Sequence, residues 1–189
     1  MSYPWDALFK PLGIHNATWE TDADETFVAS SYAYLTARDL ARVGLLMARD
    51  GRWGEQQLLP KDWVAFNRQP FDKYKAGQDE AVPGGHWWLN KGPSRAWPDA
   101  PGDTFAALGH WGQALYVLPA QHLVIVRYGD DRDGSYRHTY IRRASLSKRS
   151  RGRHDVRADR ETLWARRLLR VTCSRVVAHA REPPHSSAV

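Results

Sequence analysis

The chain contains a single cysteine, Cys173, and therefore cannot form an internal disulfide. It also lacks any run approaching about 18 consecutive apolar residues, the length needed for a membrane-spanning helix. The opening Met-Ser-Tyr-Pro-Trp-Asp has neither the basic nor the apolar region of a secretory signal. These absences argue against a disulfide scaffold and a helical membrane protein, and they predict a cytoplasmic location.

Sequence motifs for metal and nucleotide binding are missing as well. The 8 histidines include no pair at i, i+4 with the intervening Glu of a zinc hydrolase. The Asp-rich stretch at residues 130–134 does not form a calcium loop, because Gly129 would stand at the first ligand position and no Glu closes the loop. No Gly-x-Gly-x-x-Gly or phosphate-loop pattern occurs. We therefore predict no metal site and no cofactor.

Charge is distributed unevenly along the chain, whose formal net charge is +6 at pH 7. Residues 137–189 contain 14 Lys and Arg against 4 Asp and Glu, whereas residues 1–136 contain 13 against 17. This asymmetry predicts a globular domain over residues 1–136 and an Arg-rich tail over residues 137–189. Such a tail is typical either of a nucleic-acid-binding arm or of a segment of foreign origin.

Two helices are indicated in the globular part. Thr36 precedes Asp39 by three residues, the spacing of a capping box, and apolar residues follow with helical periodicity. A helix is predicted over residues 37–49, ending at Asp50-Gly51, where the glycine is free to adopt a left-handed conformation. A shorter helix is predicted over residues 61–67, after Pro60.

The rest of the globular part indicates a β-hairpin and long loops. An alternating segment at residues 113–118, a tight connection and a β-branched run at residues 123–126 predict the hairpin. A short strand is expected at residues 86–89. Polar or Pro- and Gly-rich stretches are expected to be loops, namely residues 15–25, 67–85 and 91–103.

The hairpin begins with Gly109-His110-Trp111-Gly112. Two glycines around a His and a Trp suit a backbone that another molecule approaches closely, rather than a core strand. A lone His on a strand is more often structural than catalytic, so both roles stay open for His110. Four residues with hydroxyl groups precede the first helix, namely Ser30, Ser31, Tyr32 and Tyr34. Their side chains either belong to a site or form hydrogen bonds at the helix start and pack their aromatic rings there.

Several blocks of this sequence resemble β-lactamase-related serine hydrolases. Residues 8–14, Leu-Phe-Lys-Pro-Leu-Gly-Ile, are similar to the family's Pro-Leu-Gly turn. Residues 30–51 resemble its TARDLAR-G-LL-DG helix, and residues 58–64 continue that block. The end of the same domain is matched by residues 86–90 and 105–129. In the family this end contains the letters GH-GQ, then an apolar strand, a proline and the letters LVIVR-G. The likeness covers residues 3–136 and is greatest to the 6-aminohexanoate-dimer hydrolase branch.

The resemblance implies an α+β fold, with helices and an antiparallel sheet segment of a β-lactamase/transpeptidase-like architecture. It also implies acyl-enzyme chemistry like that of class C β-lactamases, in which the Ser of a Ser-x-x-Lys motif attacks a small amide or ester with help from a Tyr. A third motif, Lys-Thr-Gly or a His variant, lies on the strand beside the nucleophile.

In this chain the third motif corresponds to His110-Trp111-Gly112. By analogy His110 replaces the cation or hydrogen-bond donor, and Gly112 lets the substrate lie against the strand. The backbone N–H of Gln113 would be one of two donors to the oxyanion. These four residues are the predicted substrate-binding wall.

The nucleophile motif does not occur where the family order requires it. Ser145-Leu-Ser-Lys148 has the right letters, but it follows the third motif and lies in the basic tail. The Tyr motif is missing too. We therefore expect no catalytic residue in this chain and no acyl-enzyme from the chain alone. We expect an incomplete hydrolase domain whose N-terminal half is missing, with exposed sheet edges and low stability.

The tail departs from the family, which normally ends in a helix packed on the sheet. We expect it to be disordered or weakly helical over residues 163–177. Its abrupt change in composition suggests translation in a shifted frame of a GC-rich gene. A rival interpretation is a non-enzymatic protein whose tail contacts nucleic-acid phosphates, and a third is a pseudo-enzyme. The absence of interleaved aromatics or a recognised binding fold argues against a nucleic-acid partner, and no membrane partner is predicted.

Overall fold

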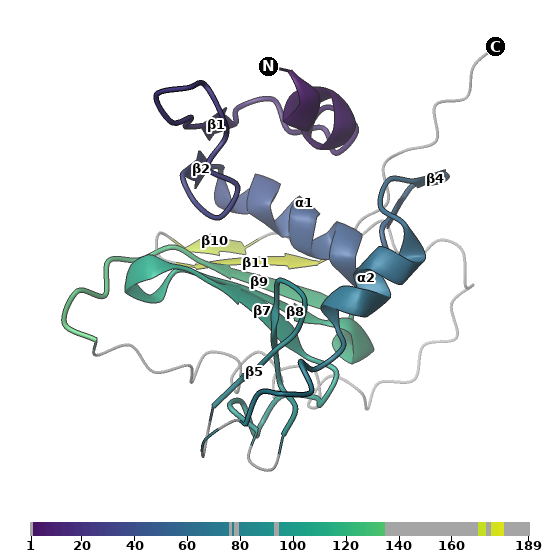
Figure 1. Cartoon of the computed structure of the whole chain (residues 1–189), viewed down its shortest axis with the longest axis vertical. Helices are drawn as coiled ribbons and strands as arrows, with labels where there is room; N and C mark the ends of the chain where they lie inside the picture. The colour runs from purple at the N-terminus through teal and green to yellow at the C-terminus, as the bar shows by residue number, and fades with distance from the viewer. Residues whose placement is uncertain are drawn as a thin grey trace.

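The computed structural model describes residues 2–75, 77, 80–92 and 95–134, together with the backbone of residues 170–172 and 175–179. Among these residues the main feature is an antiparallel sheet of seven strands in the order β10-β11-β9-β8-β7-β6-β5 (Figure 1). The strands are β5 (Val82–Pro83), β6 (Trp88–Leu89), β7 (Phe105–Leu108), β8 (Ala114–Leu118), β9 (Leu123–Arg127), β10 (Arg170–Thr172) and β11 (Arg175–His179). Helices and antiparallel strands together confirm the predicted α+β class.

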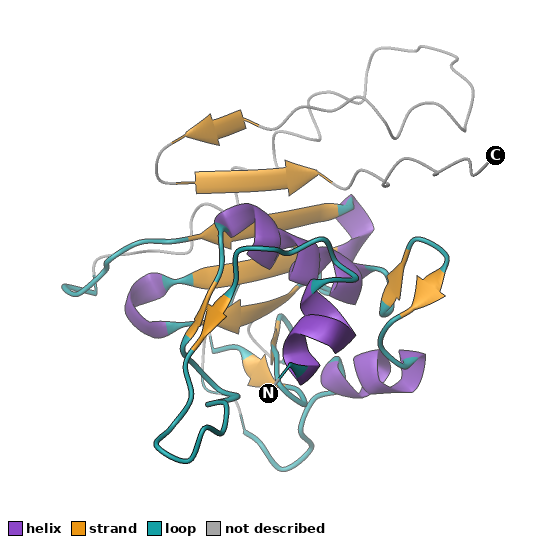
Figure 2. Ribbon diagram, turned by 90° about the horizontal axis from the view of Figure 1, so that it is seen from above, coloured by secondary structure: helices purple, strands orange, loops and turns teal. Residues whose placement is uncertain are grey.

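Helices and short ladders complete the described structure. Helix α1 (Ala37–Ala48) lies across one face of the sheet, and Figure 2 shows the same arrangement from above. The remaining elements are the π-helix η1 (Trp5–Phe9), α2 (Lys61–Asn67), the 3-10 turns η2 (His110–Gly112) and η3 (Pro119–Gln121), and two ladders that pair β1 (Thr18–Trp19) with β2 (Ala33–Tyr34) and β3 (Arg52–Trp53) with β4 (Gln56–Gln57). Both predicted helices and the β8–β9 hairpin are confirmed.

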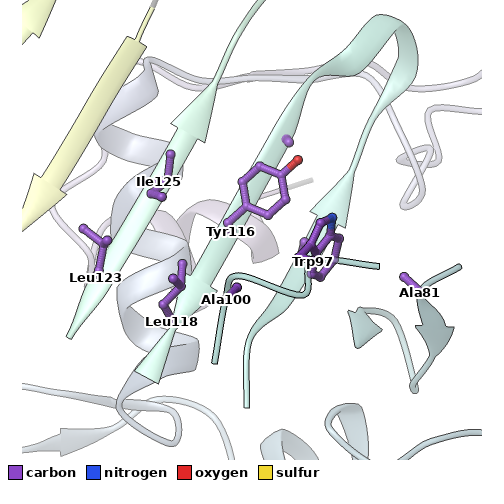
Figure 3. Close-up of a cluster of buried hydrophobic side chains, with 9 residues drawn as sticks. Ala81, Trp97, Ala100, Tyr116, Leu118, Leu123 and Ile125 are labelled. Carbon is purple, nitrogen blue, oxygen red and sulfur yellow. The ribbon is translucent and has the colours of Figure 1, made fainter. Parts of the chain in front are cut away.

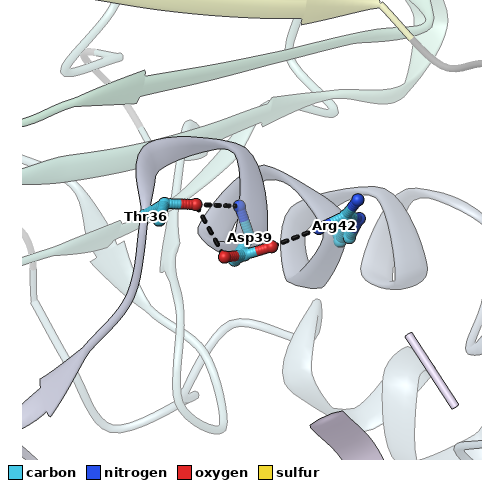
Figure 4. Close-up of polar contacts among 3 residues, drawn as sticks. All are labelled: Thr36, Asp39 and Arg42. Carbon is cyan, nitrogen blue, oxygen red and sulfur yellow. Dashed lines mark hydrogen bonds and ion pairs between the residues drawn. The ribbon is translucent and has the colours of Figure 1, made fainter. Parts of the chain in front are cut away.

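Helix α1 begins after Thr36, the predicted N-cap, with Asp39 at the predicted spacing (Figure 4). The Asp39 N–H donates to Thr36 Oγ1 at 3.2 Å, and the Thr36 hydroxyl donates to Asp39 Oδ2 at 2.6 Å. Arg42, one turn further along, pairs with the other carboxylate oxygen of Asp39. A buried carboxylate is costly unless it is hydrogen-bonded and paired, and here it has both kinds of partner. These contacts fix where the helix starts.

The end of α1 is fixed by a glycine and by an arginine from the end of α2. Gly51 has the left-handed φ of 80°, and its N–H donates to the carbonyl of Leu46 at 2.9 Å. Arg68 donates to the carbonyl oxygen of Met47 and forms an ion pair with Asp50 at 3.0 Å. The two helices are therefore joined at their C-terminal ends.

Strands β8 and β9 are buried on both faces, and one face packs against α1. The register pairs Leu115 with Val126 and Val117 with Val124, so these side chains lie on the same face. The backbone of α1 comes close to the sheet at Gly44. A Cβ added there would lie 2.8 Å from both Leu115 Cδ1 and Val124 Cγ1.

The opposite face carries the alternate residues of the same strands, shown in Figure 3: Tyr116, Leu118, Leu123 and Ile125. Trp97 packs edge-on against Tyr116, with ring centroids 5.4 Å apart. The buried amide of Asn90 holds this segment, because its Nδ2 donates to the Trp97 carbonyl at 2.9 Å and its Oδ1 accepts from the Trp97 N–H at 2.9 Å. The stretch at residues 91–103, expected to be a surface loop, therefore supplies part of the core.

Three stretches differ from expectation, the first two because tertiary pairing overrides local composition. Strand β1 lies in the stretch 15–25, and β5 lies in the stretch 67–85, both expected to be loops. Residues 170–172 and 175–177 are strands, so the predicted helix is wrong there, and residues 163–169, 173 and 174 lie outside the described residues. These tail strands are rich in β-branched residues, which favour extended backbone.

Strand β11 pairs with β9 along residues 176–179, so β9 is an inner strand, and the edges of the described sheet are β10 and β5. The predicted domain boundary at residue 136 lies outside the described residues. The division into a domain and a separate tail stays a prediction.

Substituting Gly44→Val should lower the free energy of unfolding by about 1–3 kcal/mol, because the added side chain overpacks the interface between α1 and the sheet. Urea unfolding of the full chain measures the change. Gly102→Val is the matched control, since a Cβ there meets only Arg95 Nη1 at 4.0 Å and its effect should stay within about 0.5 kcal/mol. Equal effects of the two substitutions would contradict the close packing at Gly44.

Candidate functional site

The predicted wall residues lie in the turn that joins β7 to β8. Strand β7 ends at Leu108, residues His110–Gly112 form the short turn η2, and β8 begins at Ala114. The resemblance implied a strand position for this motif, whereas the structure places it in the connection at the strand end. The structure brings His110, Trp111, Gly112 and Gln113 together because they are consecutive in one tight turn.

The backbone of this turn is strained at Trp111, which has φ 51° and ψ 42°, while Gly112 has φ 75°. A left-handed conformation costs a residue with a Cβ about 1–2 kcal/mol. Inside the turn the N–H of Gly109 donates to the carbonyl of Gln113 at 2.7 Å, and the N–H of Gln113 donates to the carbonyl of His110 at 3.3 Å. Strain of this kind at a bulky residue often marks a functional site.

The side chains of the turn are accessible from outside. His110 and Gln113 are exposed, and Trp111 is 41% exposed. The rings of His110 and Trp111 lie 4.4 Å apart between centroids, inclined by 38°. The turn therefore presents an imidazole and an indole side by side, together with an exposed amide at Gln113, a combination that can hydrogen-bond a polar ligand and cover its apolar part.

The last residue of β9 and residues that follow it contact the turn. The Asp131 N–H donates to the Trp111 carbonyl at 3.1 Å, and Arg127 Nη1 donates to the Gly112 carbonyl at 2.5 Å. The Arg132 guanidinium lies 4.3 Å from the centroid of the Trp111 ring, and its Nε donates to Asp130 at 2.8 Å. This cation–π contact leaves the indole only partly free.

Comparisons with known proteins bear on the fold. No model of a known protein family matches the chain, and no curated protein matches it. Among solved structures, one described as "Putative 6-aminohexanoate-dimer hydrolase from Bacillus anthracis" aligns over 77% of this chain at 24% identity, with a TM-score of 0.57. The aligned part of this chain shares the fold of the corresponding part of that protein. It spans only 38% of that protein's length.

This shared fold agrees with the β-lactamase-like hydrolase architecture that the resemblance implied. The similarity assigns no role to a residue of the turn. The roles of the wall residues, including the oxyanion role of the Gln113 N–H, therefore stay proposals.

The hydroxyl-bearing residues before α1 lie in a segment that contacts its neighbours in sequence. The indole N–H of Trp19 donates to the Ser31 carbonyl at 3.0 Å, and the Glu20 N–H donates to the Tyr32 carbonyl at 3.1 Å. A hydrogen bond with Glu20 raises the pKa of the Tyr34 phenol. These contacts support the structural interpretation, in which the segment holds the β1–β2 ladder.

Sequence reasoning missed Tyr128, the residue after the end of β9, whose side chain reaches the start of α1. Its hydroxyl donates to the Leu35 carbonyl at 3.0 Å, just before the helix begins. Burial, followed by the negative charge of Asp39, raises the pKa of Tyr128 to about 12. The contact spans 93 residues of sequence, so no local pattern could have revealed it.

Two further findings concern the described residues only. They contain no group of three or more His, Cys, Asp or Glu side chains placed to hold a metal ion. None of the helices in that part of the chain is long and apolar enough to cross a membrane.

The raised pKa of Tyr128 predicts a pH effect on stability. Folding favours the neutral phenol, so the stabilisation is fully present below about pH 10 and is lost as the pH rises towards about 12. Below pH 10 the wild type should be more stable than Tyr128→Phe by about 1 kcal/mol, the value of one hydrogen bond. That advantage should shrink between pH 10 and 12, as measured by urea unfolding. Parallel stability curves for the two proteins would contradict this account.

Proposed function

We propose that this chain carries the substrate-binding wall of a β-lactamase-related serine hydrolase that acts on small amides or esters through an acyl-enzyme. The observation that carries the proposal is the strained, exposed turn at residues 109–113 on a fold shared with a protein described as a hydrolase. In this account the turn binds and orients the substrate, and the chain supplies no nucleophile of its own.

Each wall residue has a role that its geometry permits. The exposed imidazole of His110 hydrogen-bonds a polar group of the substrate, and the neighbouring Trp111 ring covers an apolar stretch of it. The side-chain amide of Gln113, also exposed, can donate to and accept from an amide substrate. A short linear amide, with methylene segments between polar groups, matches this mixture of contacts.

The oxyanion role of the Gln113 backbone requires a rearrangement. Its N–H donates to the His110 carbonyl at 3.3 Å, beyond the usual hydrogen-bond range of about 2.7–3.2 Å. We propose that this weak bond gives way when a substrate carbonyl approaches, so that the N–H turns to the developing negative charge.

The nucleophile would come from a separate segment. The Ser-x-x-Lys letters at residues 145–148 follow the turn in sequence and lie outside the described residues. Nucleophile and base must be within hydrogen-bond reach of each other to form an acyl-enzyme. We propose that a polypeptide segment bearing such a pair completes the site, and that the chain alone binds a substrate without converting it.

Binding of the linear dimer of 6-aminohexanoate tests the wall directly. The purified full chain should bind this amide in isothermal titration calorimetry, and His110→Ala should weaken the affinity at least tenfold by removing one polar contact. His15→Ala is the matched control, an exposed histidine in another part of the chain that should leave the affinity unchanged. Equal affinities of the wild type and His110→Ala, or no binding by the wild type, would contradict the proposal.

Hydrolysis assays test the claim that the chain lacks a nucleophile. Nitrocefin and p-nitrophenyl butyrate should be hydrolysed no faster by the purified chain than by buffer. Turnover by the wild type that disappears in His110→Ala would show that the chain is a complete enzyme and would overturn the claim.

A second candidate function rests on the excess of Lys and Arg over Asp and Glu in residues 137–189. In that account the basic segment contacts nucleic-acid phosphates, and affinity for duplex DNA falls steeply as salt rises because counterions are released on binding. Fluorescence anisotropy with a labelled DNA duplex at low and moderate salt measures this affinity and tests the candidate function. No binding at low salt removes this candidate.

A further inference from the structure

The turn that carries the wall residues is held from outside at two successive carbonyls. The carbonyl of Trp111 accepts from the Asp131 N–H, and the carbonyl of Gly112 accepts from Arg127 Nη1. Within residues 109–113, these are the two residues with a left-handed backbone. The peptide groups that need external support are therefore the ones that receive it.

The Arg127 guanidinium occupies a slot between two glycines. A Cβ at Gly112 would lie 2.6 Å from Arg127 Nη1, and a Cβ at Gly129 would lie 2.8 Å from Arg127 Cζ. Neither position can carry a side chain while the guanidinium stays in place. The resemblance explained Gly112 by close approach of a substrate, whereas the structure gives an internal reason, the close approach of Arg127.

The pairing of β8 with β9 brings Arg127 to this slot. Arg127 is the last residue of β9, and its register partner is Ala114, the first residue of β8. Its side chain therefore starts beside the point where the turn enters the sheet. The carboxylate of Asp131 lies at the same place, since its Oδ2 would be 3.3 Å from a Cβ at Gly112.

We propose that Arg127 is a positioning residue for the site. Its guanidinium, seated between Gly112 and Gly129, fixes the backbone of Trp111 and Gly112 and so determines where His110 and Gln113 lie. A planar guanidinium with several donors in a fixed fork suits this slot, and the single ammonium of a lysine does not reproduce it. This inference rests on the proposed function, because the residues that Arg127 positions are those of the proposed substrate-binding wall.

Amide hydrogen exchange measured by NMR on the full chain tests this role. Arg127→Gln should speed exchange at the Asp131 and Gln113 amides at least tenfold, while Val117, buried in β8, keeps its rate. Arg127→Lys should restore only part of the protection. Gly129→Ala is an independent variant that keeps the arginine but places a methyl group in its slot, and it should reproduce the loss. Arg52→Gln, at an exposed arginine paired with Glu55, is the control.

Unchanged protection of Asp131 and Gln113 in both Arg127→Gln and Gly129→Ala would overturn the proposal. So would acceleration of Val117 by the same factor, since that result signals general destabilisation rather than release of the turn.

Titration with the linear 6-aminohexanoate dimer separates this proposal from the proposed function. If the wild type binds the dimer, Arg127→Gln should bind it at least fivefold more weakly, and equal affinity despite a released turn would overturn the positioning role. If the wild type binds no dimer, the proposed function fails, and the exchange rates alone decide whether Arg127 positions the turn.

Discussion

The close packing of helix α1 on strands β8 and β9 is the contact on which the rest of the described structure depends. Gly44 lets the helix backbone approach the side chains of Leu115 and Val124, and the Thr36 N-cap and Gly51 fix the two helix ends. Since α1 packs on one face of these strands and Trp97 on the other, a shift of one residue in the β8–β9 pairing would move every side chain of the shifted strand to the wrong face. The register is thereby fixed, and it sets Arg127 opposite Ala114, beside the candidate site.

The site combines local strain with contacts from another segment. The left-handed Trp111 is unfavourable in isolation, and the hydrogen bonds from Asp131 and Arg127 offset that cost. A turn held in this way keeps its side chains in place without burying them, which is what binding a substrate requires. The sheet register places Arg127 beside the turn, Arg127 holds the turn, and the turn carries the residues proposed to bind substrate.

Local patterns were sufficient to predict α1, α2 and the β8–β9 hairpin, because their caps, turns and periodicity lie within a few residues of each other. The sequence also singled out His110, Trp111, Gly112 and Gln113. It could not reveal the contact between Arg127 and Gly112, 15 residues apart, or that between Tyr128 and Leu35, 93 residues apart. Nor could it show that β11 pairs with β9, because strand pairing depends on which edges the tertiary structure leaves open.

The central claim is that the turn between β7 and β8 is a ligand-binding wall. Intermolecular nuclear Overhauser effects between the linear 6-aminohexanoate dimer and the isotope-labelled full chain test it most directly. The account predicts contacts from the methylene protons of the dimer to the Trp111 indole and to the His110 ring. Contacts confined to other exposed aromatic residues, such as Trp63 and Phe66 on α2, would contradict it.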